Sequence, residues 1–343
     1  MELTPRKMAI IAEIVKAHIE NGEPIGSKQL AARLPDPPST ATLRNEMSDL
    51  REMGYLEQPH TSAGSIPTNK AYRLYVSELM GKETLSDESK EIIDAMLEQV
   101  RPDPEAIGSS AAKILSELTG LTALAAPSVR QETRLKKVSI MPMGRGSAVV
   151  FVIADDGRTA SRLVRTGGDF TAALQQRFDE ICAEKICGRE LHSLDPAYLQ
   201  TVAVTAGLDA LSLAPLFSCV FEMAGEFKNT RVNMGGEANI LTLCPAEGQA
   251  RRAMELLRSS EVVGNIFSAA TAPVGVVFGD DTGYSELGPT GMIVASFGED
   301  KELGRLALIG PTRMEYEKLL PCAEYLAKRI GSIMTEVLKG LED

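Results

Sequence analysis

Residues 39–53 read STATLRNEMSDLREM, and this stretch decides the fold of the N-terminal region. Leu43, Met47 and Leu50 recur at three- and four-residue spacing, which places them in one narrow apolar stripe along a helix. Ser39 can cap the free backbone N–H groups of the first turn. The pattern therefore predicts a helix that is anchored on one side and offers polar side chains on the other.

Two helices are predicted before this one. The first covers about residues 5–20, because apolar residues recur every three or four positions and Pro5 suits a first helical turn. The second is short, covers residues 28–34 and has Ser27 as its cap; the proline-rich turn after it forbids its continuation. Together with the third helix, they predict a helix-turn-helix.

A two-stranded wing follows. Residues 55–58 are predicted as a strand and 59–65 as a tight loop, and Ile66 begins a return strand before a further helix that ends near Leu79. The order of helix, helix, turn, helix and wing is that of a winged helix-turn-helix.

Such a domain places its third helix in the major groove. Arg44 can donate two hydrogen bonds to guanine, Asn45 can pair with adenine, and the small Ala41 admits a thymine methyl. Ser39 and Thr40, with the N–H groups of the first turn, can hold a phosphate. A solvated helix face and a plain β-turn are the alternative readings of the helix and the wing. The predicted DNA-binding set is Ser27, Lys28, Ser39, Thr40, Thr42, Arg44, Asn45, Ser48, His60, Thr61, Ser62, Ser65 and Arg73.

The charge distribution allows this function. A net charge of -11 over 343 residues is unfavourable for a nucleic-acid binder, because phosphate contacts need Lys and Arg. Residues 1–80, however, hold nine Lys and Arg against ten Asp and Glu, so most of the acidity belongs to the rest of the chain. At this length, with 44% hydrophobic residues, we expect two or three folded domains.

Motifs for catalysis, metal or cofactor binding are missing from the sequence. The five cysteines are scattered, without a Cys-x-x-Cys pair, and no phosphate-binding loop or nucleophile elbow can be assembled. Asp155-Asp156 and Asp280-Asp281 could be imagined as metal ligands, but they follow predicted strands and are interpreted as turn residues. We expect no catalytic residue, no metal and no cofactor. Without a signal peptide or an apolar run long enough to cross a bilayer, the protein is expected in the cytoplasm.

The chain beyond residue 105 is predicted to be mixed α/β. A helix over 105–119 and a closing C-terminal helix with Pro321 in its first turn flank the strands, and residues 170–228 are mainly helical. A short strand is predicted at 240–243 and a helix at 249–258. The other strands are predicted at 135–143, 147–154, 159–166, 274–278, 292–297 and 306–309.

Strands before and after a helical block indicate a sheet domain with an insertion. The predicted boundaries are 1–80 for the winged helix, 81–104 for a helical linker, 105–167 and 265–343 for the two parts of the sheet domain, and 168–264 for the insertion.

Several motifs along the chain are distinctive. They are Gly22–Lys28, Ala41–Met47, Gly54-Tyr55-Leu56, Pro59–Gly64, Ile66-Pro67-Thr68, Tyr72-Arg73, Gly235-Gly236 with Asn239, and Ile309–Met314 with Tyr316. These motifs closely resemble the HrcA family of heat-inducible transcription repressors. The resemblance spans the chain and is weakest over about 145–230.

The resemblance implies an α+β multidomain protein. It would join a winged helix to a GAF-like domain that is interrupted by an inserted, mainly helical dimerisation domain. It also implies a repressor of chaperone operons that binds the CIRCE inverted repeat of double-stranded DNA as a homodimer, is modulated by the chaperonin GroEL and has no membrane partner.

Three departures from the family pattern stand out. Ser65 replaces the usual wing Arg, so a positive charge is lost there, and Ala71 replaces a common Gly. Residues 279–282 read Gly-Asp-Asp-Thr in place of the usual Gly-Glu-x-Asn, which leaves the role of that loop open. A ligand-gated regulator that senses a small effector in the GAF-like domain is the main alternative, and a pure protein-interaction module is another.

Overall fold

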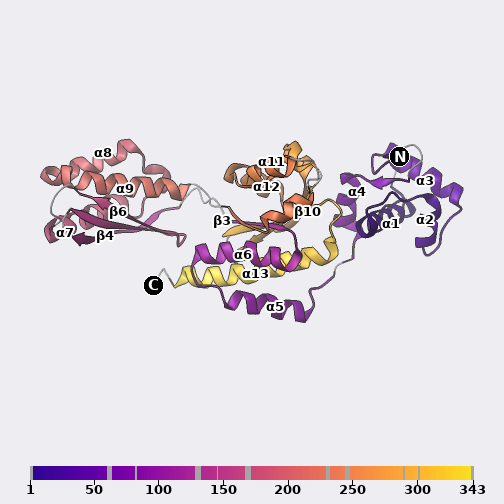
Figure 1. Cartoon of the computed structure of the whole chain (residues 1–343), viewed down its shortest axis with the longest axis horizontal. Helices are drawn as coiled ribbons and strands as arrows, with labels where there is room; N and C mark the ends of the chain where they lie inside the picture. The colour runs from indigo at the N-terminus through magenta and orange to yellow at the C-terminus, as the bar shows by residue number, and fades with distance from the viewer. Residues whose placement is uncertain are drawn as a thin grey trace. The chain divides into compact units, whose positions relative to one another are not determined.

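The computed structural model describes residues 3–59, 64–81, 83–127, 133–144, 146–166, 171–228, 232–243, 248–288, 290–299 and 302–340. The chain divides into two compact units (Figure 1). The first contains residues 1–100, 109–125 and 232–331, and the second contains 101–108, 126–231 and 332–343.

The first unit begins with the predicted winged-helix elements. They are α1 (Pro5–Asn21), α2 (Ser27–Arg33), α3 (Thr40–Glu52), β1 (Leu56–Glu57), β2 (Ile66–Pro67) and α4 (Asn69–Leu74). Strands β1 and β2 pair antiparallel, as a wing requires. The apolar faces of α1, α2 and α3 are buried together, with Ile10, Ile14, Leu30, Leu43 and Leu50 fully inaccessible to solvent.

One helix end in this region differs from the prediction, and another agrees with it. Helix α2 starts at Ser27 itself, and Gly26 is the capping residue, because the Gln29 side chain accepts a hydrogen bond from the Gly26 N–H at 2.9 Å. The chain continues from α4 into a π-helical turn over Tyr75–Leu79, so the end near Leu79 is confirmed.

The rest of the first unit is built on a five-stranded sheet with the order β7-β3-β10-β9-β8. We call residues 109–125 and 232–331 the sheet domain. Its strands are β3 (Thr122–Pro127), β7 (Asn233–Gly235), β8 (Val274–Phe278), β9 (Thr290–Phe297) and β10 (Gly304–Pro311). Nearly every residue of β3, β9 and β10 is buried, so helices cover both faces of the sheet.

The strands at 274–278, 292–297 and 306–309 are confirmed, and β3 and β7 were missed. Residues 122–127 read TALAAP, which has neither the alternation nor the β-branched side chains by which a strand is recognised. A central strand buried on both faces needs no alternation, and its small side chains let helices approach closely.

Helices α6 (Pro104–Thr119) and α13 (Tyr316–Lys339) run along one side of the sheet in Figure 1, with α11 (Gln249–Leu257) and α12 (Ser260–Ala269) on the other. The linker forms α5 (Asp87–Glu98). Two predictions were wrong here. Residues 240–243 are the short helix α10 (Ile240–Leu243) and not a strand, and α13 starts five residues before Pro321, which therefore lies inside it.

The second unit contains a separate three-stranded sheet of the order β4-β5-β6, made of β4 (Leu135–Gly144), β5 (Ser147–Ala154) and β6 (Thr159–Arg165). Helices α7 (Ala172–Ile181) and α9 (Ala210–Lys228) pack on this sheet, and α8 (Pro196–Thr205) packs on α9. Val150, Phe178 and Leu216 lie at the centre of its hydrophobic core.

The compact units differ from the predicted domain boundaries. The three strands were assigned to the sheet domain, and the insertion was expected to begin at 168 and end at 264. In the structure, these strands pair only with one another among the described residues, and the second unit takes in 126–231. Helices α11 and α12 belong to the first unit. Strand pairing is not encoded in local pattern, so the sequence could not assign these strands to the correct sheet.

Helix α9 is long and apolar enough, over Ala210–Phe227, to cross a membrane by length and composition. Its inward side chains, including Leu213, Phe217 and Val220, belong to the hydrophobic core of the second unit. The apolar composition is that of a core helix.

Candidate nucleic-acid interface

Helix α3 has the two faces that the sequence predicts. Leu43 and Leu50 are completely buried and Met47 is 4% exposed, while Thr40, Ala41, Arg44 and Asn45 are exposed. The Arg44 and Asn45 side chains make no hydrogen bond or ion pair with any residue that the structure describes. Both are therefore available to a ligand, and they lie in the first half of the helix, the part that enters a groove.

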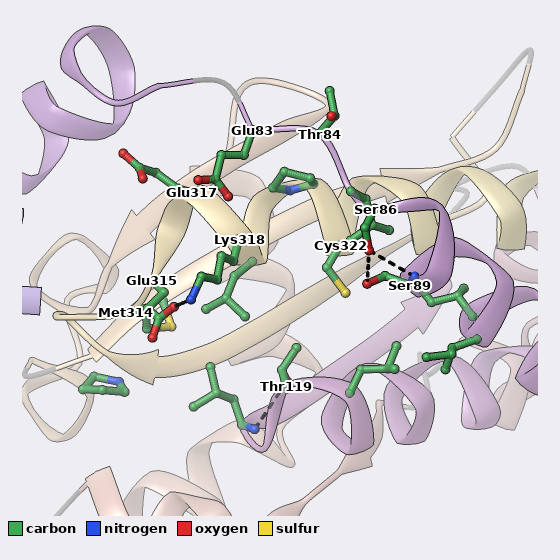
Figure 2. A pocket seen from close by; sticks show the side chains of 18 residues that line it. Glu83, Thr84, Ser86, Ser89, Thr119, Met314, Glu315, Glu317, Lys318 and Cys322 are labelled. Carbon is green, nitrogen blue, oxygen red and sulfur yellow. Dashed lines mark hydrogen bonds and ion pairs between the residues drawn. The ribbon is translucent and has the colours of Figure 1, made fainter. Parts of the chain in front are cut away.

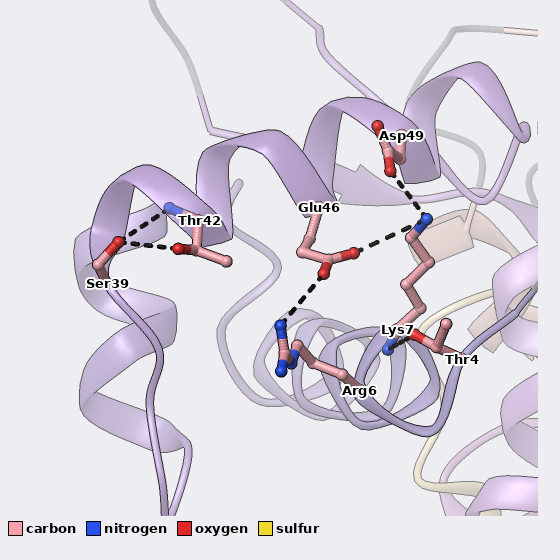
Figure 3. Close-up of polar contacts among 7 residues, drawn as sticks. All are labelled: Thr4, Arg6, Lys7, Ser39, Thr42, Glu46 and Asp49. Carbon is pink, nitrogen blue, oxygen red and sulfur yellow. Dashed lines mark hydrogen bonds and ion pairs between the residues drawn. The ribbon is translucent and has the colours of Figure 1, made fainter.

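The amino end of α3 is capped as expected. The Ser39 hydroxyl accepts a hydrogen bond from the Thr42 N–H at 3.1 Å and lies 2.9 Å from the Thr42 hydroxyl (Figure 3). Thr40, the first residue of the helix, is exposed. This end of the helix carries partial positive charge, which suits an anion.

The predicted DNA-binding residues divide into four groups in the structure. Exposed are Lys28, Ser39, Thr40, Arg44 and Asn45, and half-buried are Ser27, Thr42 and Ser48. His60, Thr61 and Ser62, which follow β1 in the sequence, lie outside the described residues. Ser65 and Arg73 form the fourth group, because each binds another side chain of the protein: Ser65 is buried, whereas Arg73 is exposed.

Two cations of α1 pair with two of the three acidic side chains of α3, Glu46 and Asp49 (Figure 3). The Lys7 Nζ donates to Asp49 Oδ2 at 2.8 Å and lies 3.8 Å from Glu46 Oε2, and the Arg6 guanidinium lies 3.7 Å from the other Glu46 oxygen. The hydrogen bond that Lys7 donates to Asp49 raises the pKa of Lys7, so the ammonium stays charged. Sequence reasoning missed this pairing because Lys7 and Asp49 are 42 residues apart.

The base of the wing is locked onto the loop between α1 and α2. Ile25 and Ser65 exchange backbone hydrogen bonds of 3.0 and 2.9 Å. A Cβ on Gly64 would lie 2.4 Å from the Ile25 carbonyl, so only glycine fits this contact.

The prediction that Ser65 belongs to the DNA-binding surface is wrong for its side chain. Ser65 is 2% exposed, and its hydroxyl accepts a hydrogen bond from Arg51 Nη1 at 3.0 Å. The strand begins at the next residue, and its period of two turns Ser65 inward. Arg51, at the end of α3, is thereby held against the base of the wing.

Arg73 also binds another side chain of the protein. Its guanidinium forms an ion pair with Asp281 and lies 5.3 Å from the centre of the Phe278 ring. The neighbouring Asn69 donates to Asp280. Asp280 and Asp281, interpreted from sequence as turn residues, do lie in a 3₁₀ turn, but their carboxylates bind the winged helix. We therefore remove Arg73 from the proposed phosphate-binding set.

The features typical of an enzyme or a metal site are not found in the described part of the chain. It holds no cluster of three or more His, Cys, Asp and Glu side chains that could bind a metal. Burial raises the pKa of the thiols of Cys182, Cys187 and Cys322, which makes them poor nucleophiles. Asp155 and Asp156 accept hydrogen bonds from the backbone N–H groups of Arg134 and Arg158, as turn carboxylates do.

A cavity of about 630 Å³ opens between the start of α5, the end of α6 and the start of α13, all in the first unit (Figure 2). Its wall is apolar around Ile93, Leu121 and Leu319. The polar groups at its rim bind one another: Lys318 pairs with Glu315, and the Ser86 and Ser89 hydroxyls lie 2.8 Å apart.

Two family models match this chain. Residues 2–80 match the winged helix-turn-helix transcription repressor domain described as HrcA DNA-binding, and residues 105–320 match the HrcA protein C-terminal domain. The chain belongs to the HrcA family. The winged helix is therefore the DNA-binding part of a heat-inducible transcription repressor, and α3 is its third helix.

HrcA relatives match along nearly the whole chain. The heat-inducible transcription repressor HrcA of Desulforudis audaxviator is 29% identical over 345 residues, covering 99% of this chain and all of that protein. HrcA of Carboxydothermus hydrogenoformans is also 29% identical, covering 96% and 97%. A crystal structure of a protein described as hypothetical aligns with a TM-score of 0.66 at 21% identity and covers 98% of this HrcA chain, which shows a shared fold.

Proposed function

We propose that this protein represses chaperone operons of the class I heat-shock type in the cytoplasm by binding the CIRCE inverted repeat as a homodimer. The observation that carries the proposal is the division of α3. Three buried apolar side chains fix the helix, while Arg44 and Asn45 project from the opposite side without partners among the described residues.

Arg44 and Asn45 would read bases, because their side chains can form the bidentate hydrogen bonds that distinguish guanine and adenine in the major groove. The capped amino end of α3, Thr40 and the exposed Lys28 would hold phosphates and fix the register of the helix. His60, Thr61 and Ser62 remain proposed wing contacts. The pairing of Glu46 and Asp49 with α1 supports this assignment, since it removes two uncompensated negative charges from the approach to DNA.

The homodimer would form through the sheet of the second unit. One face of that sheet covers the core, and the other carries large exposed apolar side chains: Met141 is 53% exposed, Leu163 is 63% and Phe151 is 36%. Met141, Val149 and Leu163 form one cross-strand row. An apolar stripe of this kind on a solvent face is typical of an interface, and a second copy fits because an inverted repeat demands two-fold symmetry.

The sheet domain would be GAF-like, and chaperonin modulation comes from the family resemblance. The five-stranded sheet with helices on both faces supports the first point. Chaperonin modulation is tested by adding purified chaperonin to dilute repressor, which is expected to raise the fraction of repressor that binds the operator. An unchanged fraction would show that the chaperonin does not modulate the repressor.

A ligand-gated regulator is the second candidate, and the cavity beside α5 and α13 is the observation that favours it. Its volume is that of a small-molecule site. A bound effector would raise the melting temperature by mass action, so a thermal-shift screen of metabolites separates this reading from a purely chaperonin-controlled repressor.

Substitutions on α3 test the proposed function. Arg44→Ala and Asn45→Ala should each weaken binding to the inverted repeat by about 1–3 kcal/mol and relax the choice of base at one position of each half-site. Titrations in gels against the wild-type repeat and against single-base variants measure both effects. Arg251→Ala, which removes an exposed arginine from α11, is the control and should bind as wild type. Unchanged affinity in both α3 variants would show that α3 does not read the operator.

A further inference from the structure

Motifs that lie more than 200 residues apart in sequence meet at one contact between the winged helix and the sheet domain. On the winged helix they are the carboxyl end of α1 and helix α4, and on the sheet domain they are residues 278–281 and 311–317. DNA reading does not use them. We infer that they form a clamp that fixes the orientation of the reading helix on the sheet domain, with Arg73, Asp281 and Arg313 as positioning residues.

The first part of the clamp is polar. Arg73 binds Asp281 Oδ1, and Asn69 binds Asp280. The other oxygen of Asp281 accepts the backbone N–H of Phe278 at 3.2 Å, so the carboxylate is oriented from both sides. The Arg73 and Asp281 side chains are 50% and 31% exposed, and pairs with such exposure add little to stability. Their geometry therefore serves orientation more than folding.

The second part is a buried aromatic cluster. Tyr72 of α4 meets Phe278 and Tyr316 of the sheet domain, and the three ring centres lie 6.2 to 6.5 Å from one another at tilted angles. All three side chains are at most 1% exposed. Tilted rings at these distances pack favourably and in a defined geometry. The cluster thus gives the two domains one preferred arrangement.

The third part holds the end of α1. Gly22 closes α1 with φ +69°, and a Cβ there would lie 3.3 Å from the Arg313 guanidinium carbon. A cation at the carboxyl end of a helix is stabilised by the helix dipole. Burial, together with the same guanidinium, lowers the pKa of His18, whose Nδ1 lies 2.7 Å from the Tyr72 hydroxyl.

One further hydrogen bond joins the winged helix to the sheet domain: the Tyr75 hydroxyl donates to Glu317 Oε1 at 2.6 Å. Because α1 also carries Lys7, which binds α3, a fixed α1 fixes the reading helix. In a dimer, the direction of each reading helix sets the spacing between half-sites that both can reach at once. This last step rests on the proposed function, whereas the clamp itself does not.

A charge swap in the full chain tests the clamp. Arg73→Asp should speed amide hydrogen exchange in α4 and in residues 278–283, and so should Asp281→Arg, because the contact opens more often. The double variant R73D/D281R should regain most of the wild-type protection. The matched control is Arg329→Asp, which breaks a pair between α13 and α5 with similar exposures of 42% and 34% and should leave α4 unchanged. If the swap fails to restore protection, or if the single variants exchange like wild type, there is no clamp.

A DNA measurement then separates positioning from direct contact. Asp281→Arg and Arg313→Ala should each weaken binding to an inverted repeat of native spacing by about ten-fold and leave binding to a single half-site unchanged. Equal losses on both duplexes would show that these residues do not act through orientation. If the wild type shows no preference for the inverted repeat, the proposed function fails, while the exchange result still decides whether the clamp exists.

Discussion

Several side chains in this repressor make contacts that differ from the roles their residue types suggest. Ser65 and Arg73 have the chemistry of DNA contacts, yet one faces inward toward Arg51 and the other binds Asp281. Lys7 has the chemistry of an exposed lysine, yet it is 7% exposed and pairs with Glu46 and Asp49 of α3. Which partner a charged group finds is decided in three dimensions, so residue type alone could not assign these roles.

Lys7 offers a test at this scale. Lys7→Met keeps the aliphatic stem but leaves Glu46 and Asp49 without its positive charge, so operator binding should weaken by a few fold and more strongly at low salt. Fluorescence anisotropy at two ionic strengths measures this effect. The double variant K7M/D49N should recover part of the loss. Lys113→Met, on an exposed face of α6, is the control. If Lys7→Met binds the operator as wild type, or if K7M/D49N binds no better than Lys7→Met, the pairing does not serve DNA binding.

Helices and strands in this chain follow their local pattern where one face meets water. Helix α3 was placed to within a residue because its apolar stripe has the helical period and Ser39 caps it. Strand β3 was missed because it is buried on both faces and rich in alanine. Residues 240–243 form a helix although they read as a strand, since a four-residue apolar run has no period that distinguishes the two.

The anchoring of α3 is tested by removing its central side chain. Leu43→Ala leaves a cavity at a completely buried position and should destabilise the winged helix by about 2–5 kcal/mol. Hydrogen exchange in α1 and α3 reports this loss locally, which matters because a chain of several domains does not unfold in two states. Ala41→Ser, on the exposed face, should stay within about 0.5 kcal/mol of wild type. Equal protection in both variants would contradict the core placement of Leu43.

At the scale of the whole molecule, the proposed homodimer needs a surface through which two copies of the chain pair about a two-fold axis. An inverted repeat requires two reading helices, and the exposed row of Met141, Val149 and Leu163 is the surface that we propose for pairing.

Leu163→Asp tests that surface. A charge in an apolar interface is costly, so the variant should elute and scatter light as a 36.9 kDa monomer while retaining its affinity for a single half-site. Leu211→Asp places the same charge at a leucine that is 91% exposed on α9 and should remain dimeric. If both variants are dimers, the dimer interface does not include Leu163.

The sequence by itself determined the winged helix, the polar side of α3, the strands of the sheet domain that carry β-branched residues, and the family. These features are local, because a period of 3.6, a cap or a turn residue acts within a few positions of the chain. Only the tertiary structure decided that residues 135–165 form their own sheet, that Lys7 neutralises α3, and that Tyr72, Arg73, Asp281 and Arg313 meet. Each of these depends on groups separated by tens to hundreds of residues, and packing brings such groups together without leaving a local pattern.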